Sequence, residues 1–124
     1  MPKFAPAPAA VVAAFEAATG GLQGLEPRKM FGYPAAFLRG QLVCGVFQDR
    51  IMLRLGEADR AALLALPGAR PFEPMPGRPM REYVELPASL LRSPAKLRGW
   101  VERGVAYAAT LPPKPAKRSP RKKS

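Results

Sequence analysis

The chain has 124 residues, a net charge of +11 and a hydrophobic content of 48%, values that predict one globular domain with a core of its own. Its single cysteine, Cys44, excludes an internal disulfide, and the absence of histidine excludes the usual zinc sites and histidine-dependent catalysis. No apolar run approaches the roughly 20 residues of a membrane helix, so we expect a cytoplasmic protein with no membrane partner.

The N-terminal segment MPKFAPAPAAVVAAFEAATGG has two interpretations. An early cation and a stretch of small apolar residues are typical of a signal peptide, but two prolines and Glu16 interrupt that stretch. We favour a first helix from about Pro8 to Ala18, which Gly20-Gly21 would end.

Three runs rich in aromatic and branched residues follow and predict antiparallel strands: MFGYPAAFL, QLVCGVF and RIMLRL. The dipeptides between them, Arg39-Gly40 and Gln48-Asp49, are the length of hairpin turns. In the first run, Gly32 and Pro34 predict a bend or bulge of one long strand. The second run has almost no polar member, which predicts a central strand with Cys44 as a small buried residue.

The third run leads into a second helix. In RIMLRL, the branched residues Ile51, Leu53 and Leu55 alternate with Met52 and Arg54. This alternation predicts a half-buried strand with Arg54 facing outward. Acidic residues after Gly56 favour the start of a helix, and Pro67-Gly68 would end it.

Prolines dominate the next segment, ARPFEPMPGRPMREYVELP, and exclude a central strand there. We predict a short edge strand that starts at Phe72, a connecting loop over residues 75–79 and a second strand over residues 81–86. A helical turn would follow Pro87.

Ser93-Pro94 suit the start of a last helix, with serine at the N-cap and proline at the first helical position. The predicted order is helix, three strands, helix, two strands, helix. It indicates an α+β fold of two layers, an antiparallel sheet of about five strands with helices on one face. We assign residues 1–111 to this domain and residues 112–124 to a tail.

The tail, PPKPAKRSPRKKS, has no acid and no large apolar residue, so we expect it to be disordered. Its six cations are Lys114, Lys117, Arg118, Arg121, Lys122 and Lys123. Three interpretations stay open: a solvated end, a nucleic-acid arm that displaces counterions from phosphates, or a contact with another anionic partner. Since the tail has no aromatic residue, any nucleic-acid contact through it would be independent of sequence.

No catalytic, nucleotide-binding or cofactor-binding motif stands out, so we expect no cofactor and no enzyme. Glu82 and Glu85 have opposite parity on a strand, which argues against a joint acid/base pair. The paired cations before the first strand are either a solvated strand end or part of a partner-binding surface. The candidates for that surface are Arg28, Lys29, Tyr33, Arg78 and Arg81.

In its motifs and their order the chain resembles the N-terminal domain of the TfoX/Sxy family over about residues 8–110. The residues that carry the likeness are Arg28, Met30-Phe31-Gly32, Gly40, Leu53-Arg54-Leu55, Met80, Tyr83 and Leu86-Pro87. The resemblance implies the element order given above and a bacterial cytoplasmic protein. The best-known members regulate competence for DNA uptake as coactivators that work with a transcription factor, and the family has no accepted catalytic residues.

Two departures from the family pattern are visible. The basic tail stands where competence regulators carry a second domain, and Tyr33-Pro34 stands where members often have a second glycine. The chain therefore resembles a stand-alone branch of the family.

We accordingly hypothesise a non-enzymatic regulatory or accessory protein with a protein-binding body and a tail that contacts nucleic acid. Its protein partner would be of the kind of a transcription factor. The alternative is a protein-protein adaptor or homodimeric binding module with no nucleic-acid role. A third class, a small-molecule enzyme or ligand binder, would show a specific and saturable stabiliser in a thermal-shift screen.

Overall fold

Six strands and four helices make up the part of the chain that the computed structural model describes, residues 8–30, 32–73, 77, 80 and 82–112. The helices are α1 (Ala9–Thr19), α2 (Glu57–Leu64), α3 (Ala88–Leu91) and α4 (Pro94–Ala109). The strands are β1 (Leu25–Met30), β2 (Tyr33–Leu38), β3 (Gln41–Phe47), β4 (Arg50–Arg54), β5 (Arg70–Pro71) and β6 (Tyr83–Glu85). Neighbouring strands are antiparallel, in the order β1-β2-β3-β4-β6-β5. The predicted α+β class is confirmed, with six strands where about five were expected.

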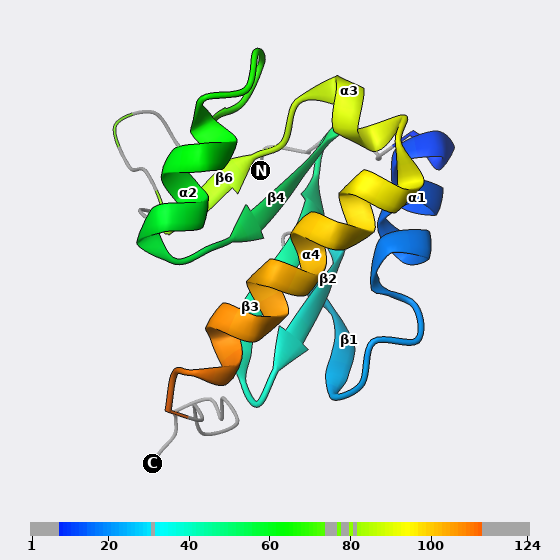
Figure 1. Ribbon diagram of the computed structural model, residues 1–124. Helices are drawn as coiled ribbons and strands as arrows, with labels where there is room; N and C mark the ends of the chain where they lie inside the picture. Colours follow the sequence, from blue (N-terminus) through cyan, green and yellow to red (C-terminus); the bar gives the residue numbers. More distant parts are fainter. Residues whose placement is uncertain (1–7, 31, 74–76, 78–79, 81, 113–124) are drawn as a thin grey trace.

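Helices α1 and α4 lie against each other across one face of the sheet (Figure 1). On α4, every third or fourth residue is buried, which gives the helix one face against the sheet: Leu97, Val101, Gly104 and Ala108. Phe15 and Ala18 form the corresponding buried face of α1.

The hairpins around the central strand have the predicted positions. Leu38 pairs with Gln41 across one turn, and Phe47 pairs with Arg50 across the next. At the first turn Arg39 and Gly40 both have positive φ, 49° and 85°, the combination that a tight two-residue hairpin of matching twist requires. Strand β3 between them is buried over its last six residues, so its prediction as the central strand is confirmed.

The prediction of one long kinked first strand is wrong. The chain instead folds back after Met30, which pairs with Tyr33, so the stretch forms the separate strands β1 and β2. Gly32 lies in this turn with φ of 83°, a left-handed conformation that glycine adopts without strain. The one shift of register between β2 and β3 falls between Ala36 and Phe37 and not at Gly32 or Pro34.

In the second half of the chain the elements lie close to their predicted places. The edge strand β5 has two residues and ends just before Phe72, and β6 is shorter than the predicted strand over residues 81–86. Ser93 precedes α4 as predicted, but its Oγ donates to the carbonyl of Ser89 (3.2 Å) and makes no capping bond to the helix. Most of the predicted loop over residues 75–79 and all tail residues after Pro112 lie outside the described residues.

Candidate functional site

The described chain ends at a polar anchor that joins the end of α4 to the β2–β3 turn. Arg39 Nη2 donates hydrogen bonds to the carbonyls of Ala109 (2.8 Å) and Leu111 (3.2 Å). Gln41 Nε2 donates to the carbonyl of Pro112 (2.9 Å). A cation at the C-terminal end of a helix also interacts favourably with the helix dipole. We call these contacts the tail root, because they fix the point on the body from which residues 113–124 depart.

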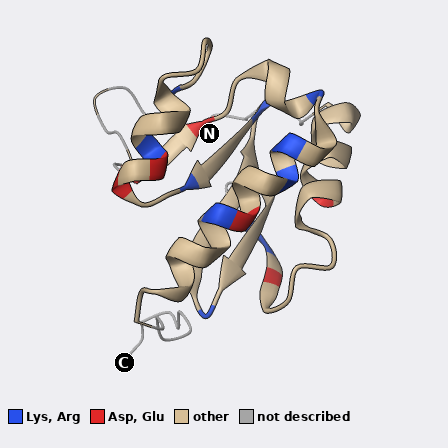
Figure 2. Ribbon diagram, in the orientation of Figure 1, with Lys and Arg blue, Asp and Glu red and all other residues tan. Residues whose placement is uncertain are grey.

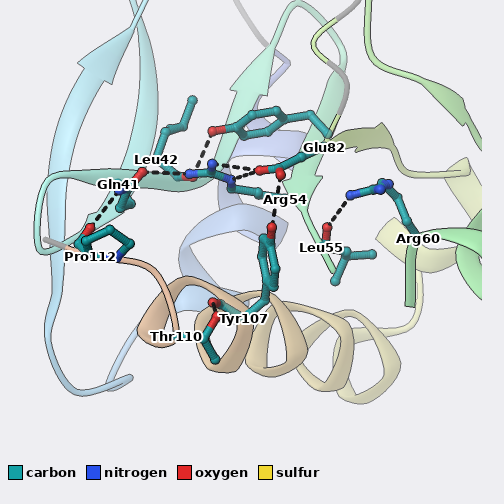
Figure 3. A network of polar contacts seen from close by, with 10 residues as sticks. Gln41, Leu42, Arg54, Leu55, Arg60, Glu82, Tyr107, Thr110 and Pro112 are labelled. Carbon is teal, nitrogen blue, oxygen red and sulfur yellow. Dashed lines mark hydrogen bonds and ion pairs between the residues drawn. The ribbon is translucent and has the colours of Figure 1, made fainter. Parts of the chain in front are cut away.

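Arg54 extends the tail root into the sheet, as Figure 3 shows. Its Nη1 donates to Gln41 Oε1 (2.8 Å), and its guanidinium forms an ion pair with Glu82 Oε1 (2.7 Å). Glu82 Oε2 in turn accepts a hydrogen bond from the hydroxyl of Tyr107 on α4 (2.9 Å). An unbroken chain of polar contacts therefore runs from Pro112 through β3 and β4 to Tyr107 in the last turn of α4. We call these four side chains, Gln41, Arg54, Glu82 and Tyr107, the Arg54 network.

The prediction that Arg54 faces outward is wrong, since only 17% of its side chain is exposed. The guanidinium carbon lies 5.5 Å from the ring centroid of Tyr83 and 5.9 Å from that of Tyr107. Its partners come from residues that are 13, 28 and 53 positions away, so the alternating pattern of the strand could not reveal them.

The pKa of Glu82 lies below its ordinary value of 4.5. Partial burial alone would raise the pKa, but hydrogen bonds from Arg54 and Tyr107 and the positive charges of Arg54 and Arg60 outweigh it. Burial raises the pKa of Tyr83 to about 12, so its hydroxyl stays protonated and donates to the carbonyl of Leu42 (3.0 Å). At neutral pH the Arg54 network therefore holds one carboxylate, one guanidinium and the protonated hydroxyl of Tyr107, whose pKa is raised by partial burial and by Glu82.

This depressed pKa predicts a dependence of stability on pH. A carboxyl group with a lower pKa in the folded state stabilises the fold above its unfolded pKa, and this contribution is lost as the pH falls below about 4.5 through the folded value. The variant Glu82→Gln should therefore lose less stability than the wild type between pH 5 and pH 3 (roughly the window in which carboxyl groups titrate). Urea unfolding at a series of pH values measures this difference, and parallel curves for the two proteins would contradict it.

Of the candidate partner-binding residues, the three that the structure describes, Arg28, Lys29 and Tyr33, do not share one exposed surface. Arg28 and Lys29 are consecutive residues of β1, and they pair with Ala35 and Pro34 of β2. Because consecutive residues of a strand point to opposite faces, the side chains of Arg28 and Lys29 lie on opposite faces of the sheet. Arg28 is already engaged, with Glu26 at 3.0 Å and with its guanidinium carbon 5.0 Å from the ring centroid of Phe37. Tyr33 is only 4% exposed and packs edge-to-face on Phe47 at 5.8 Å, so its side chain belongs to the core. Arg78 and Arg81 lie outside the described residues.

Glu82 and Glu85, which the alternation of a strand places on opposite faces, form ion pairs with different arginines. Glu85 is buried and forms ion pairs with Arg50 (2.7 Å) and Arg70 (3.2 Å), whereas Glu82 belongs to the Arg54 network. Cys44 is fully buried in β3, and burial raises the pKa of its thiol to about 12, so the thiol is protonated at neutral pH. Over the described ranges, no group of three or more cysteine or acidic side chains is placed to hold a metal ion.

Sequence reasoning missed three residues of this region: Arg39, Gln41 and Tyr107. Arg39 and Gln41 donate to carbonyls 70 to 72 positions away, and Tyr107 donates to Glu82, 25 positions away. Only the identity of Arg39 in a hairpin turn was visible in advance, and nothing in the sequence pointed to carbonyls at the end of α4.

The described part of the chain is thus a small α+β domain whose polar network joins the sheet, the last helix and the start of the tail. The chain belongs to the TfoX N-terminal domain family, whose model matches residues 17–108. This family indicates a regulatory or accessory role. No curated protein and no solved structure matches the chain. None of the helices between residues 8 and 112 is long and apolar enough to span a membrane.

Proposed function

We propose that this protein is a non-enzymatic regulatory protein of the TfoX type, acting in the cytoplasm. Its body binds a protein partner, of the kind of a transcription factor. Its tail adds a contact with nucleic acid that does not depend on sequence. The family supports the regulatory role, and the distribution of charge supports the contact with nucleic acid.

The proposed contact with nucleic acid is supported mainly by the concentration of positive charge directly after the tail root. Six of the chain's twenty cations lie in residues 113–124 with no acid among them, which leaves +5 of the net +11 on the rest. On the body, basic and acidic side chains are mixed, as Figure 2 shows. A short, purely basic segment binds phosphates by releasing their counterions. Because the tail root holds residues 109–112 on the sheet, this segment starts from a fixed point of the domain.

The paired state of the described polar groups supports a binding role over catalysis. Glu85, the buried acidic residue, and the partly buried Glu82 are both engaged by arginines at 2.7 Å. A general acid or base needs a pKa near the working pH. The pKa of Glu82 is shifted away from neutrality, and the thiol of Cys44 is buried and protonated.

The first experiment is fluorescence anisotropy with a labelled duplex of about 20 base pairs (a length that exceeds the reach of six phosphate contacts). We expect the full chain to bind with a slope of log K against log salt of about −5, because six engaged cations release about 0.9 counterions each. A variant that ends at Pro112 keeps the tail root and should lose nearly all of this affinity and slope.

A matched control keeps the tail length and replaces its six cations with glutamine. If that variant binds as well as the wild type, counterion release by the tail is not the source of affinity. If neither the full chain nor the truncated variant binds near physiological salt, the nucleic-acid part of the proposal fails. The adaptor function of the body would then be tested by partner capture after nuclease treatment.

A further inference from the structure

The outward side of α4 carries a shallow hollow beside the chain's single tryptophan. Its volume is about 580 Å³, and its lining residues are Lys96, Gly99, Trp100, Glu102, Arg103 and Ala106. All six belong to α4, whose opposite side is buried on the sheet. The hollow therefore lies on the side of α4 that faces away from the sheet.

The two glycines inside α4 differ in what their missing side chains allow. A Cβ at position 104 would lie 2.7 Å from Leu53 Cδ1 and 2.8 Å from the carbonyl oxygen of Arg54, so glycine there serves the packing of helix on sheet. A Cβ at position 99 would meet nothing within 4 Å. Glycine in a helix interior costs about 1 kcal/mol relative to alanine. The fold of this chain gives no packing reason for Gly99, and the missing side chain leaves the hollow beside Trp100 open.

Trp100 is half-buried and its ring is held in place from one side. The guanidinium carbon of Arg103 lies 5.4 Å from the ring centroid, and Arg103 Nη1 forms an ion pair with Asp59 Oδ1 at 2.8 Å. Lys96 lies four residues before Trp100 and Arg103 three residues after it, so both cations share the tryptophan's side of the helix. Lys96 is exposed and makes no hydrogen bond or ion pair with the described residues. The hollow thus combines an aromatic ring, a free cation and an open space.

Charge decides between the two occupants that such a surface could take. A second copy of the chain would bring another net charge of +11 to the same face, and like charges oppose association. A polyanion with flat apolar groups matches both the cations and the ring. Unpaired nucleobases stack on aromatic side chains while neighbouring cations follow the phosphates. Paired bases inside a duplex are not available for such stacking.

We propose that Trp100 is a stacking platform for one unpaired base of single-stranded nucleic acid. The base lies in the hollow above Gly99, and Lys96 contacts a phosphate of the same strand. This inference rests on the proposed nucleic-acid contact of the tail and adds to it a preference for single strands. The tail departs from the end of the same helix, so both contacts can act on one strand.

The test uses the full chain and its own tryptophan as the probe. Two labelled strands of equal length are compared, oligo(dT) of eight nucleotides and an abasic strand that has the same phosphates without bases. Oligo(dT) should quench the tryptophan emission and should bind at least about fivefold more tightly than the abasic strand, since base stacking on an aromatic residue contributes a factor of this size or more. The abasic strand should bind through its phosphates alone, without quenching.

The variant Gly99→Leu fills the hollow and leaves Trp100 and the tail unchanged. Because position 99 has free space, we expect this variant to fold normally, to bind the two strands equally and to show no quenching. The matched control is Ala13→Leu, which adds the same side chain at an exposed position of α1 and should behave like the wild type.

The outcomes separate this inference from the function on which it rests. If both strands bind equally to the wild type without quenching, the stacking site is refuted and the tail contact stands. If neither strand nor a duplex binds, both are refuted. Tryptophan emission that changes with protein concentration alone, together with a dimer in analytical ultracentrifugation, would assign the hollow to a second copy and overturn the inference.

Discussion

Replacing Gly104 with alanine should lower the free energy of unfolding by about 2 kcal/mol, although alanine is the better helix former by about 1 kcal/mol. The added Cβ would lie 2.7 Å from Leu53 Cδ1 and 2.8 Å from the carbonyl oxygen of Arg54. Leucine can rotate away at some cost, but the carbonyl belongs to β4 and cannot move without disturbing the sheet. The helix must therefore move away from the strand, which loosens the packing of the two layers.

Gly99→Ala is the matched control, because it makes the same chemical change in the same helix. Its Cβ meets nothing within 4 Å, so only the helix propensity changes, and stability should rise by up to about 1 kcal/mol. In a thermal unfolding experiment we expect Tm to fall by roughly 10 °C for Gly104→Ala and to rise by about 5 °C for Gly99→Ala. A shift of the same sign in both variants would show that α4 does not approach β4 as closely as the structure indicates.

Much of the fold could be predicted because it depends on local sequence signals. Apolar runs separated by Arg39-Gly40 and Gln48-Asp49 gave β3 and β4 within a residue of their true positions. Ser93-Pro94 before α4 and the glycines after α1 marked the start of one helix of the layer and the end of the other. These signals act over fewer than about ten residues, so a single sequence carries them in full.

The division of the first strand was missed although a signal was present. Gly32 is compatible with a bend of one strand, but glycine with positive φ two residues after a strand suits a hairpin turn equally well. The choice depends on whether residues 25–30 can serve as an edge strand. Pro27 lies in the middle of that strand, and proline argues against a strand unless the strand lies at an edge. The position at the edge of the sheet is a property of the whole fold and cannot be seen in the segment.

For the candidate partner-binding residues, the alternation of side chains along a strand predicts some features of their placement and not others. Strand alternation alone places Arg28 and Lys29 on opposite faces, so the sequence already contained the argument against joining them. The burial of Tyr33 depends on Phe47, fourteen residues away and on another strand. The tail root is still less local, since its hydrogen bonds join residues about 70 positions apart. For such contacts a single sequence offers no periodic pattern to follow.

Replacing Arg54 with alanine should lower the free energy of unfolding by about 2–3 kcal/mol, a Tm decrease of roughly 10–20 °C. The variant removes the ion pair with Glu82 at 2.7 Å, the hydrogen bond to Gln41 at 2.8 Å and the contacts with two tyrosine rings. The loss should stay below that of a fully buried pair, because 36% of the Glu82 side chain remains exposed to water.

The control for this prediction is Arg28→Ala, because Arg28 has the same kinds of partner at the surface. It pairs with Glu26 at 3.0 Å and lies 5.0 Å from the ring centroid of Phe37, with 39% of its side chain exposed. Exposed pairs contribute less than about 1 kcal/mol, so Arg28→Ala should be nearly neutral. Urea unfolding with equal m-values tests both variants as changes of stability alone. Equal losses would mean that burial does not set the strength of these pairs. A loss confined to Arg54→Ala would show that the partly buried contacts of Arg54 with Glu82, Gln41 and the two tyrosine rings stabilise the fold, whereas the exposed contacts of Arg28 do not.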